Sequence, residues 1–317
     1  MSSSSKYAPV IVTTLCRYEH FSRCIESLAR CTHANETDLY IGLDYPLKES
    51  HWQGYRKILD YLPSIQGFRT IYIQKREQNF GARKNFYAIR DYCYENGNDR
   101  YIITEDDNEF SPNFLDYINK GLDKYEDNPN IYAICAYSPH IGRQSSYQQN
   151  TYATYGYSAW GVGLWRKKVI DFTSYPQENN IRRVKQWLSS PATCIKIFRR
   201  EPRILYTLYR MINKSMLYGD TCTVTNSILN NLFSVFPTIS KVRNWGNDGS
   251  GINCEAIDDF YVHQPIDTAT TFDFDDIEIK ETELKALRKH ASLSWKQWVK
   301  FPYQIVKFWL KQGVGSK

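Results

Sequence analysis

The stretch that decides the fold is Tyr101-Ile-Ile-Thr-Glu-Asp-Asp107, an apolar run that ends in three consecutive acids. Its β-branched residues predict a buried strand over 101–104. The carboxylates of Glu105, Asp106 and Asp107 are then expected together where that strand ends. Like charges this close repel, so the cluster needs a cation or strong hydrogen bonds to stay ionised.

Short apolar runs alternate with segments of helical spacing on the N-terminal side of this stretch. Strands are predicted over 9–15, 39–43 and 69–73, and helices over 21–28, 51–62 and 81–94. Such alternation predicts an α/β fold, a mixed and mostly parallel sheet flanked by helices.

Polar side chains follow the first two of these strands as well. Thr13, Thr14 and Arg17 follow the first strand, and Asp44 follows the second. Because ligands of open α/β sheets bind outside the carboxyl ends of the strands, these side chains and the acids are expected to form one site. Asn79 and Lys84, after the third strand, are candidates to reach a diphosphate or nucleoside from the same edge.

The C-terminal side of the chain gives further predictions. Ser111 followed by Pro112 predicts the start of a helix, with Ser111 as N-cap. The remaining elements are expected as follows: a helix to about 125, a strand over 131–137, a Gly/aromatic loop over 155–163, a helix near 166–172, helices over 176–217, one helix over 218–235, a flexible polar loop over 243–251 and an acidic connector over 265–284.

Composition limits the class of protein. The formal net charge is +6, but eight Lys or Arg and no acid follow Glu283, so the rest of the chain carries −2. A nucleic-acid binder should be basic on its folded body, which excludes nucleic acid as the main partner. The eight cysteines form no Cys-x-x-Cys pair and suit a reducing compartment. Without a secretory signal or a long apolar run, we expect a cytoplasmic protein.

The acidic cluster predicts a divalent metal. Hard carboxylate oxygens suit Mg²⁺ or Mn²⁺, which commonly bind through one or two carboxylates and substrate phosphates. A cation there would offset the charge that develops on a diphosphate leaving group. The alternative is a solvated acidic turn before the next helix.

Residues 8–255 resemble the GT-A-fold glycosyltransferases, particularly N-acetylglucosaminyltransferase I and family 2-like bacterial polysaccharide enzymes. Four places carry the resemblance: Val10-Ile-Val-Thr-Thr with Arg17, Asp44, Thr104-Glu-Asp-Asp and Trp160-Gly-Val-Gly163. They resemble, in order, the first nucleotide-binding turn, the acid that binds uracil, the DxD motif and the loop near donor sugar and acceptor. The resemblance implies Asp107 as metal ligand, Glu105 and Asp106 near ribose and sugar, and Trp160 and Gly161 at the donor.

The resemblance also implies a catalytic base. Inverting transfer needs a carboxylate that takes the proton from the acceptor hydroxyl. Related enzymes place it in a Trp-Asp segment before the last helix, and Tyr218-Gly-Asp220 occupies that position here, without the tryptophan. Asp220 is therefore the candidate base, and its alternative role is N-cap of a helix starting near Thr221.

The C-terminal segment mixes Trp, Phe and Lys. If it is helical on each side of Pro302, then Trp295, Trp298, Val306 and Trp309 share a face. This pattern suits a helix lying in a membrane interface. The alternative is a helix docked on the catalytic domain with its lysines in water.

We thus expect a catalytic domain over 1–264, with a nucleotide-binding half (8–130) and an acceptor half (131–264), and a tail over 265–317. The expected function is metal-dependent transfer from a nucleotide-sugar, with UDP favoured, to a glycan or polyprenyl-diphosphate-linked acceptor in bacterial surface polysaccharide synthesis. Peripheral attachment to the inner face of the plasma membrane is the accompanying hypothesis. Two rivals remain: a nucleotidyltransferase, which the absence of glycine in Thr13–Arg17 disfavours, and a noncatalytic glycan- or membrane-binding protein.

Overall fold

The computed structural model describes residues 6–138, 149–169, 177–214, 216–249, 263–276 and 294–314. The chain packs as two compact units, each assembled from separate stretches of sequence. The sheet unit comprises Met1–Ala153, Ser158–Val169 and Ser234–Ile277, and the helical unit comprises Thr154–Tyr157, Ile170–Phe233 and Glu278–Lys317. The division into a catalytic domain and a tail stays a prediction.

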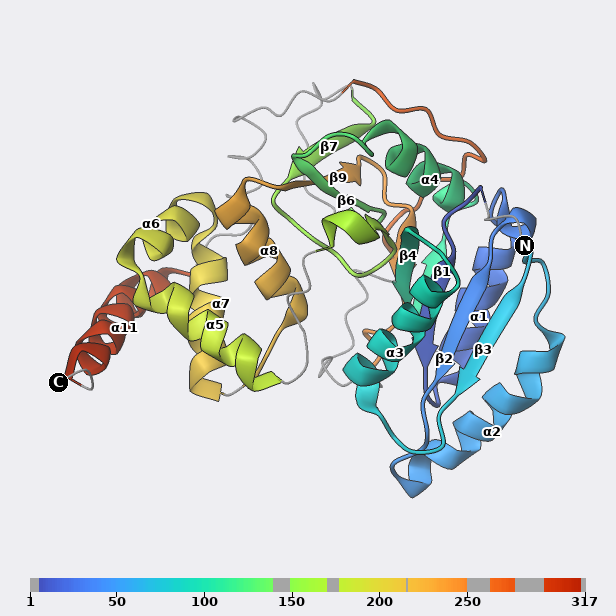
Figure 1. Cartoon of the computed structure of the whole chain (residues 1–317), viewed down its shortest axis with the longest axis horizontal. Coiled ribbons are helices and arrows are strands. Elements are labelled where there is room, and N and C mark those ends of the chain that lie inside the picture. Colours follow the sequence, from blue (N-terminus) through green and yellow to red (C-terminus); the bar gives the residue numbers. More distant parts are fainter. Residues whose placement is uncertain are drawn as a thin grey trace. The chain divides into compact units, whose positions relative to one another are not determined.

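The sheet unit is built on a mixed sheet whose described strands run in the order β3-β2-β1-β4-β8-β6-β9-β7 (Figure 1). The first four are parallel to one another, and β8 is antiparallel to β4 and to β6. The predicted α/β fold is thereby confirmed. Its strands are β1 (Val10–Thr14), β2 (Leu39–Leu43), β3 (Ile71–Lys75), β4 (Arg100–Glu105), β6 (Ile131–Cys135), β7 (Thr151–Thr154), β8 (Val162–Trp165) and β9 (Phe233–Pro237).

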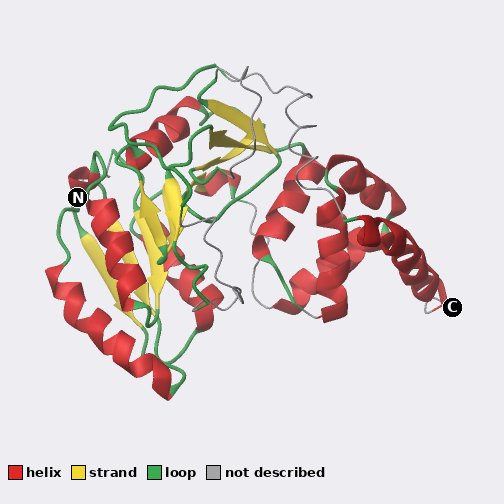
Figure 2. Cartoon of the chain, turned by 180° about the vertical axis from the view of Figure 1, so that it is seen from behind, coloured by secondary structure: helices red, strands yellow, loops and turns green. Residues whose placement is uncertain are grey.

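Four α-helices connect or cover these strands: α1 (Tyr18–Ala29), α2 (Trp52–Tyr61), α3 (Gly81–Glu95) and α4 (Phe114–Lys124). The first two pack together, since the ring of Phe21 meets that of Tyr61 edge-on. Right-handed crossovers place them on one face, and α3 lies on the other because β4 returns past β1 (Figure 2). Gly42 lets α3 approach β2, because a Cβ there would lie 3.2 Å from Ile89 Cγ2.

The structure corrects several sequence expectations in this unit. Ser111 is not the N-cap of α4; Asn113 precedes the helix, and no side chain caps it. Where a helix was expected near 166–172, the described residues 166–169 form a single 3₁₀ turn at Arg166–Lys168 directly after strand β8. The expected polar loop begins as strand β10 (Val242–Asn244), which pairs antiparallel with β5 (Asn108–Phe110).

The described part of the acidic connector is an ordered strap along α4. The backbone N–H of Phe272 donates to Asp116 Oδ2 at 2.6 Å, and Lys120 Nζ donates to the Phe272 carbonyl at 2.8 Å. The rings of Phe272 and Phe274 pack on Tyr117. Its remaining residues, 277–284, lie outside the described ranges.

The helical unit contains five described α-helices: α5 (Gln177–Ser189), α6 (Pro191–Arg200), α7 (Pro202–Lys214), α8 (Gly219–Asn230) and α11 (Trp295–Val314). Ser190 caps α6 and Pro191 follows at its first position, as their chemistry favours. The single helix expected over 218–235 is wrong: α8 ends before Asn231, whose φ of 54° is left-handed, and β9 follows.

The C-terminal segment packs into the core of the helical unit as one helix that contains Pro302. Phe301 and Ile305 are buried, and Trp309 Nε1 donates to the Leu188 carbonyl at 2.7 Å. Trp309 therefore points inward while Trp295 and Val306 are exposed, so the prediction that Trp309 shares their face is wrong. No helix in the described ranges is long and apolar enough to cross a membrane.

Candidate active site

The candidate site lies where the strand order reverses, between β1 and β4. Thr13 pairs with Glu105 across these strands, and the backbone N–H of Asp44 donates to the Thr14 carbonyl at 2.9 Å. The carboxyl ends of β1, β2 and β4 thus bring the predicted side chains to one edge. Such a reversal is where doubly wound sheets form their ligand crevice.

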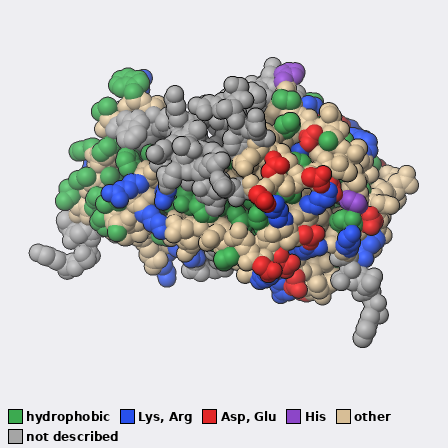
Figure 3. Space-filling view, turned by 90° about the horizontal axis from the view of Figure 1, so that it is seen from above, with side chains coloured by type: hydrophobic (Ala, Val, Ile, Leu, Met, Phe, Trp, Pro, Cys, Tyr) green, Lys and Arg blue, Asp and Glu red, His purple; other side chains and the backbone are tan. Residues whose placement is uncertain are grey.

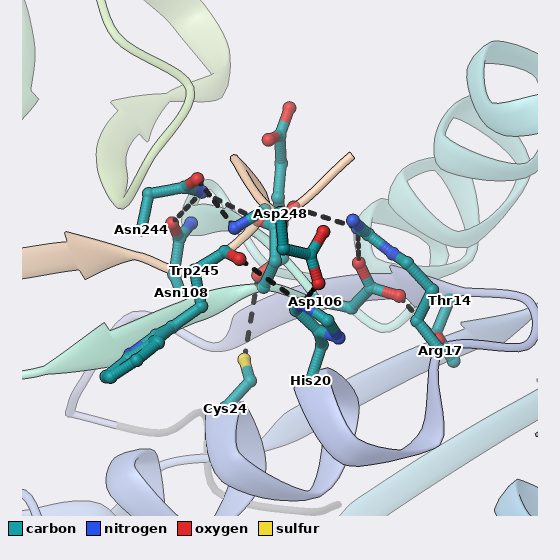
Figure 4. A network of polar contacts seen from close by, with 12 residues as sticks. Thr14, Arg17, His20, Cys24, Asp106, Asn108, Asn244, Trp245 and Asp248 are labelled. Atoms are coloured by element: carbon teal, nitrogen blue, oxygen red, sulfur yellow. Dashed lines mark hydrogen bonds and ion pairs between the residues drawn. The ribbon is translucent and has the colours of Figure 1, made fainter. Parts of the chain in front are cut away.

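Arg17 is the cation at the centre of this edge (Figure 4). Its guanidinium contacts Asp106 Oδ1 and lies 2.9 Å from Asp107 Oδ2, while Thr14 Oγ1 donates to Asp106 Oδ2 at 2.7 Å. Burial raises the pKa of Asp106, and Arg17 opposes that rise. Burial lowers the pKa of Arg17, but the two carboxylates outweigh it and raise that pKa overall. Arg17 therefore stabilises two buried adjacent carboxylates as a pair of anions.

A segment distant in sequence completes the enclosure of the acids. Because β10 pairs with β5, Asn244 Nδ2 reaches Asp107 Oδ1 at 2.8 Å and Asn108 Oδ1 at 2.9 Å. Gly246 is required next to it, since a Cβ there would lie 2.1 Å from Asp107 Oδ2. The Asn-Trp-Gly stretch was expected as a loop, and Asn244 was not predicted as a partner of Asp107.

The same segment docks on helix α1. The His20 Nε2 proton faces the Trp245 carbonyl at 3.3 Å and Asp248 Oδ2 at 3.1 Å, and the Arg23 guanidinium lies 4.2 Å from the centre of the Trp245 ring (Figure 4). These contacts fix the 244–248 segment beside the acids.

Glu105, the exposed member of the cluster, is held by the predicted aromatic loop. Trp160 Nε1 donates to Glu105 Oε2 at 3.0 Å, and its ring meets Tyr137 edge-on with centroids 4.7 Å apart. Gly161 makes this approach possible with a left-handed φ of 73°; a Cβ there would lie 2.8 Å from Phe114 Cε2. The structure thus brings Trp160 and Gly161 to the acidic cluster.

Asp44 is buried and hydrogen-bonded to the residues before α3. Its Oδ1 accepts from the N–H groups of Tyr45 and Phe80, and its Oδ2 accepts from Gly81 N and Asn79 Nδ2, at distances of 2.8 to 3.3 Å. The Asp44 carboxylate therefore accepts hydrogen bonds from the backbone N–H groups at the start of α3, in addition to any contact with a bound ligand. Lys84, one turn later, has its Nζ 4.0 Å from the centre of the Phe80 ring.

The oxygen atoms at this edge fit a hard divalent cation if the Asp107 carboxylate supplies one ligand and substrate phosphates supply others. Asp107 offers a carboxylate oxygen beside Arg17, whose charge already partly neutralises the site. In the described residues, no group of three or more His, Cys, Asp or Glu side chains is arranged to hold a metal by itself. A cation would thus need oxygens from a bound diphosphate, the usual way in which Mg²⁺ sites are completed.

Asp220 belongs to the helical unit, so its place is described there alone. It is exposed in the first turn of α8, which begins at Gly219, and Tyr218 precedes the helix without a side-chain cap. The alternative of Asp220 as N-cap is therefore wrong. Neighbouring protein atoms raise the pKa of Asp220 to about 6, which suits a group that exchanges a proton near neutral pH, while water at its exposed carboxylate opposes that rise.

No protein-family profile and no curated protein sequence matches the chain. Among solved structures, it is similar to a mannosyltransferase of Pyrobaculum calidifontis in complex with GDP-Man and Mn²⁺ (TM-score 0.35, 11% identity, covering 71% of this chain and 74% of that one). It is also similar to residues 1–349 of S. aureus TarS (TM-score 0.38, 13% identity, 71% of each chain). A third is GalNAc-T7 with UDP, GalNAc and Mn²⁺ (TM-score 0.36, 12% identity). This match covers 82% of the present chain but only 58% of the GalNAc-T7 chain. At such identities and TM-scores the chemistry of this chain has to be argued from the side chains of its own site.

Proposed function

We propose that this chain is a metal-dependent, inverting glycosyltransferase that uses a nucleotide-diphosphate sugar, with a UDP-sugar favoured. The observation that carries the proposal is the set of carboxylates at the end of β4, beside the turn after β1. Arg17, Thr14 and Asn244 hold Asp106 and Asp107 in place, and Trp160 holds Glu105. A solvated acidic turn would not need partners from three separate segments of the chain.

Each group of the site has a proposed role. Asp107 is the ligand for Mn²⁺ or Mg²⁺, which would supply positive charge at the diphosphate leaving group. Arg17 faces the same charge, and it stabilises the nucleoside diphosphate as the bond to the anomeric carbon breaks. Thr13, Asp44, Asn79 and Lys84 line the nucleotide side, and Glu105, Asp106, Trp160 and Gly161 the sugar side.

Asp220 is the proposed base. It takes the proton from the acceptor hydroxyl while that oxygen bonds to the anomeric carbon and the bond from that carbon to the diphosphate breaks. Configuration inverts because attack and departure occur on opposite faces. Its raised pKa favours this role, since a base whose pKa lies near the working pH transfers protons efficiently.

The proposed acceptor is a glycan or a polyprenyl-diphosphate-linked glycan in bacterial surface polysaccharide synthesis. A lipid-linked acceptor is held at a membrane, so the enzyme would work peripherally at the inner face of the plasma membrane.

The proposal is tested by unfolding the protein with UDP- and GDP-sugars, with and without Mn²⁺. A ligand at about a hundred times its Kd adds about 2.7 kcal/mol to the free energy of unfolding. We expect a Mn²⁺-dependent gain with one donor, and we expect Asp107→Asn to abolish it while retaining the fold. No gain with any donor would refute the assignment.

The matched control is Asp99→Asn. Asp99 directly precedes β4 at its other end, and its side chain is 90% exposed. This variant should keep the full ligand-dependent gain. The product then distinguishes the enzymes: glycosyl transfer releases a nucleoside diphosphate, whereas a nucleotidyltransferase forms a nucleotide-sugar and releases pyrophosphate.

A further inference from the structure

Helix α11 has two apolar faces, and among the described residues of the helical unit only one of them is packed against other side chains. Phe301 and Ile305 are buried in the core of the unit, where the Phe301 ring meets Tyr206 and Tyr209 of α7 edge-on or tilted, and Phe308 and Trp309 pack against the same core. This inner face accounts for the docking of the helix. It leaves the outer face to be explained.

The outer face is a continuous apolar stripe. It consists of Trp295, Val299, Tyr303, Val306 and Leu310, which are 72%, 70%, 68%, 48% and 67% exposed. Their spacing of three and four residues places them on one side of the helix over about 22 Å. In the described ranges, these five account for half of the exposed large apolar side chains. Scattered exposure is ordinary, but a stripe of this kind marks a binding surface.

Positive charge borders this stripe. Lys296 and Lys307 are exposed, and their Nζ atoms lie 5.7 Å and 5.9 Å from the ring centres of Trp295 and Tyr303. The segment Trp295–Val314 contains no acid. The helix therefore presents apolar rings and aliphatic groups next to cations.

The helical unit as a whole, α11 included, has the same sign of charge. Its sequence holds eighteen Lys or Arg and seven Asp or Glu, a net charge of +11, while the remainder of the chain carries −5. On the face drawn in Figure 3, the acidic side chains lie on the sheet unit. The positive potential thus belongs to the unit that carries the stripe, and a negatively charged partner is favoured.

We propose that the stripe on α11 docks on an anionic lipid bilayer, with the helix lying parallel to the membrane surface. Apolar and aromatic side chains would enter the interface while the bordering lysines face anionic headgroups. Nucleic acid would offer the stripe no apolar surface. The inference deepens the proposed function by naming the surface that brings the enzyme to a lipid-linked acceptor, and its evidence is independent of the acidic site.

The test is co-sedimentation of the full-length chain with vesicles of phosphatidylcholine alone or of phosphatidylcholine mixed with phosphatidylglycerol. We expect binding to the anionic vesicles that falls as salt rises. The double variant Val299→Ser/Leu310→Ser should bind at least about tenfold more weakly, because both side chains lose apolar contact with lipid. The double variant Lys296→Gln/Lys307→Gln should lose about fivefold for each lysine.

The matched control is Leu47→Ser/Ile239→Ser, which removes two side chains of the sheet unit that are 68% and 53% exposed. It should bind vesicles like the parent chain. Equal binding by the stripe variant and this control would overturn the proposal, as would equal binding to neutral and anionic vesicles. A concentration-dependent dimer that the stripe variant abolishes, without vesicle binding, would instead assign the stripe to a second copy.

The two proposals can fail separately. Asp107→Asn should still bind vesicles, and the stripe variant should keep the donor-dependent stabilisation. Loss of vesicle binding alone leaves the glycosyltransferase proposal standing, and loss of donor binding alone leaves the membrane surface standing.

Discussion

Replacing Arg17 by alanine should leave Asp106 and Asp107 as adjacent buried carboxylates without the cation that both contact. Their side chains are each 8% exposed, whereas that of Arg17 is 24% exposed. Removing one partner of a fully buried ion pair costs about 3–5 kcal/mol. Because water reaches part of Arg17, we expect a loss nearer about 2–3 kcal/mol in the free energy of unfolding.

The loss should depend on pH in a defined direction. Repulsion requires both carboxylates to be ionised, and burial already raises the pKa of Asp106 above its usual value. Without Arg17 that pKa rises further, so acidification protonates Asp106 first and relieves the repulsion. The stability deficit of the variant should therefore shrink as the pH falls from 7.5 toward the raised pKa of Asp106.

The assay is urea unfolding followed by circular dichroism at several pH values, with and without Mn²⁺. Since the guanidinium no longer competes for the carboxylates, Mn²⁺ alone should stabilise Arg17→Ala more than the parent chain. Arg100→Ala is the control: its partner Asp123 is 61% exposed, and breaking such a surface pair costs less than about 1 kcal/mol. Equal losses in the two variants, or a Mn²⁺ effect no larger in Arg17→Ala, would refute the reasoning.

Three further predictions follow from the geometry. Asp220→Asn should keep donor binding and lower kcat by about a hundredfold or more; because a base must be ionised, parent kcat should fall as the pH drops through about 6, and a profile flat across that range would exclude Asp220. Gly246→Ala places a Cβ 2.1 Å from Asp107 Oδ2, so Mn²⁺-dependent donor stabilisation should be lost, whereas Gly249→Ala, which strains a left-handed φ of 84° but places its Cβ within 4 Å of nothing, should retain it. Asp44→Ala leaves the backbone N–H groups of Phe80 and Gly81, at the start of α3, and that of Tyr45 without their acceptor, and should cost about 2 kcal/mol or more in urea unfolding; an unchanged unfolding midpoint would show that these hydrogen bonds contribute nothing.

The residues that form the parallel part of the sheet could be predicted because their pattern is local. Runs such as Leu39–Leu43 are apolar on both sides, and each ends at a polar residue that marks the edge of the sheet. Knowing which strand ends share an edge then places Arg17, Asp44 and the acids together. Short local patterns were therefore enough to predict the fold, which is confirmed, and the meeting of these side chains at one edge of the sheet.

The remaining features depend on contacts between distant residues. Strands β5 and β10 have three residues each and too little pattern to be recognised, yet their pairing brings Asn244 to Asp107 across 137 positions. Asn231 was a usable signal for the end of α8, since asparagine tolerates the left-handed conformation. The faces of α11 could not be assigned from periodicity alone, because apolar residues occupy two sides of that helix.

The discontinuity of the helical unit has a consequence for synthesis and for cutting the chain. Its core joins Leu188 and Leu208 to Phe301, with strap and strand residues of the sheet unit made in between. During synthesis, helices α5 to α8 therefore cannot complete their hydrophobic core until α11 has been translated. For the same reason, a truncation that removes α11 would strip part of a hydrophobic core, so the membrane surface has to be probed by point substitutions. A single proteolytic cut between α8 and α11 should likewise leave both fragments associated.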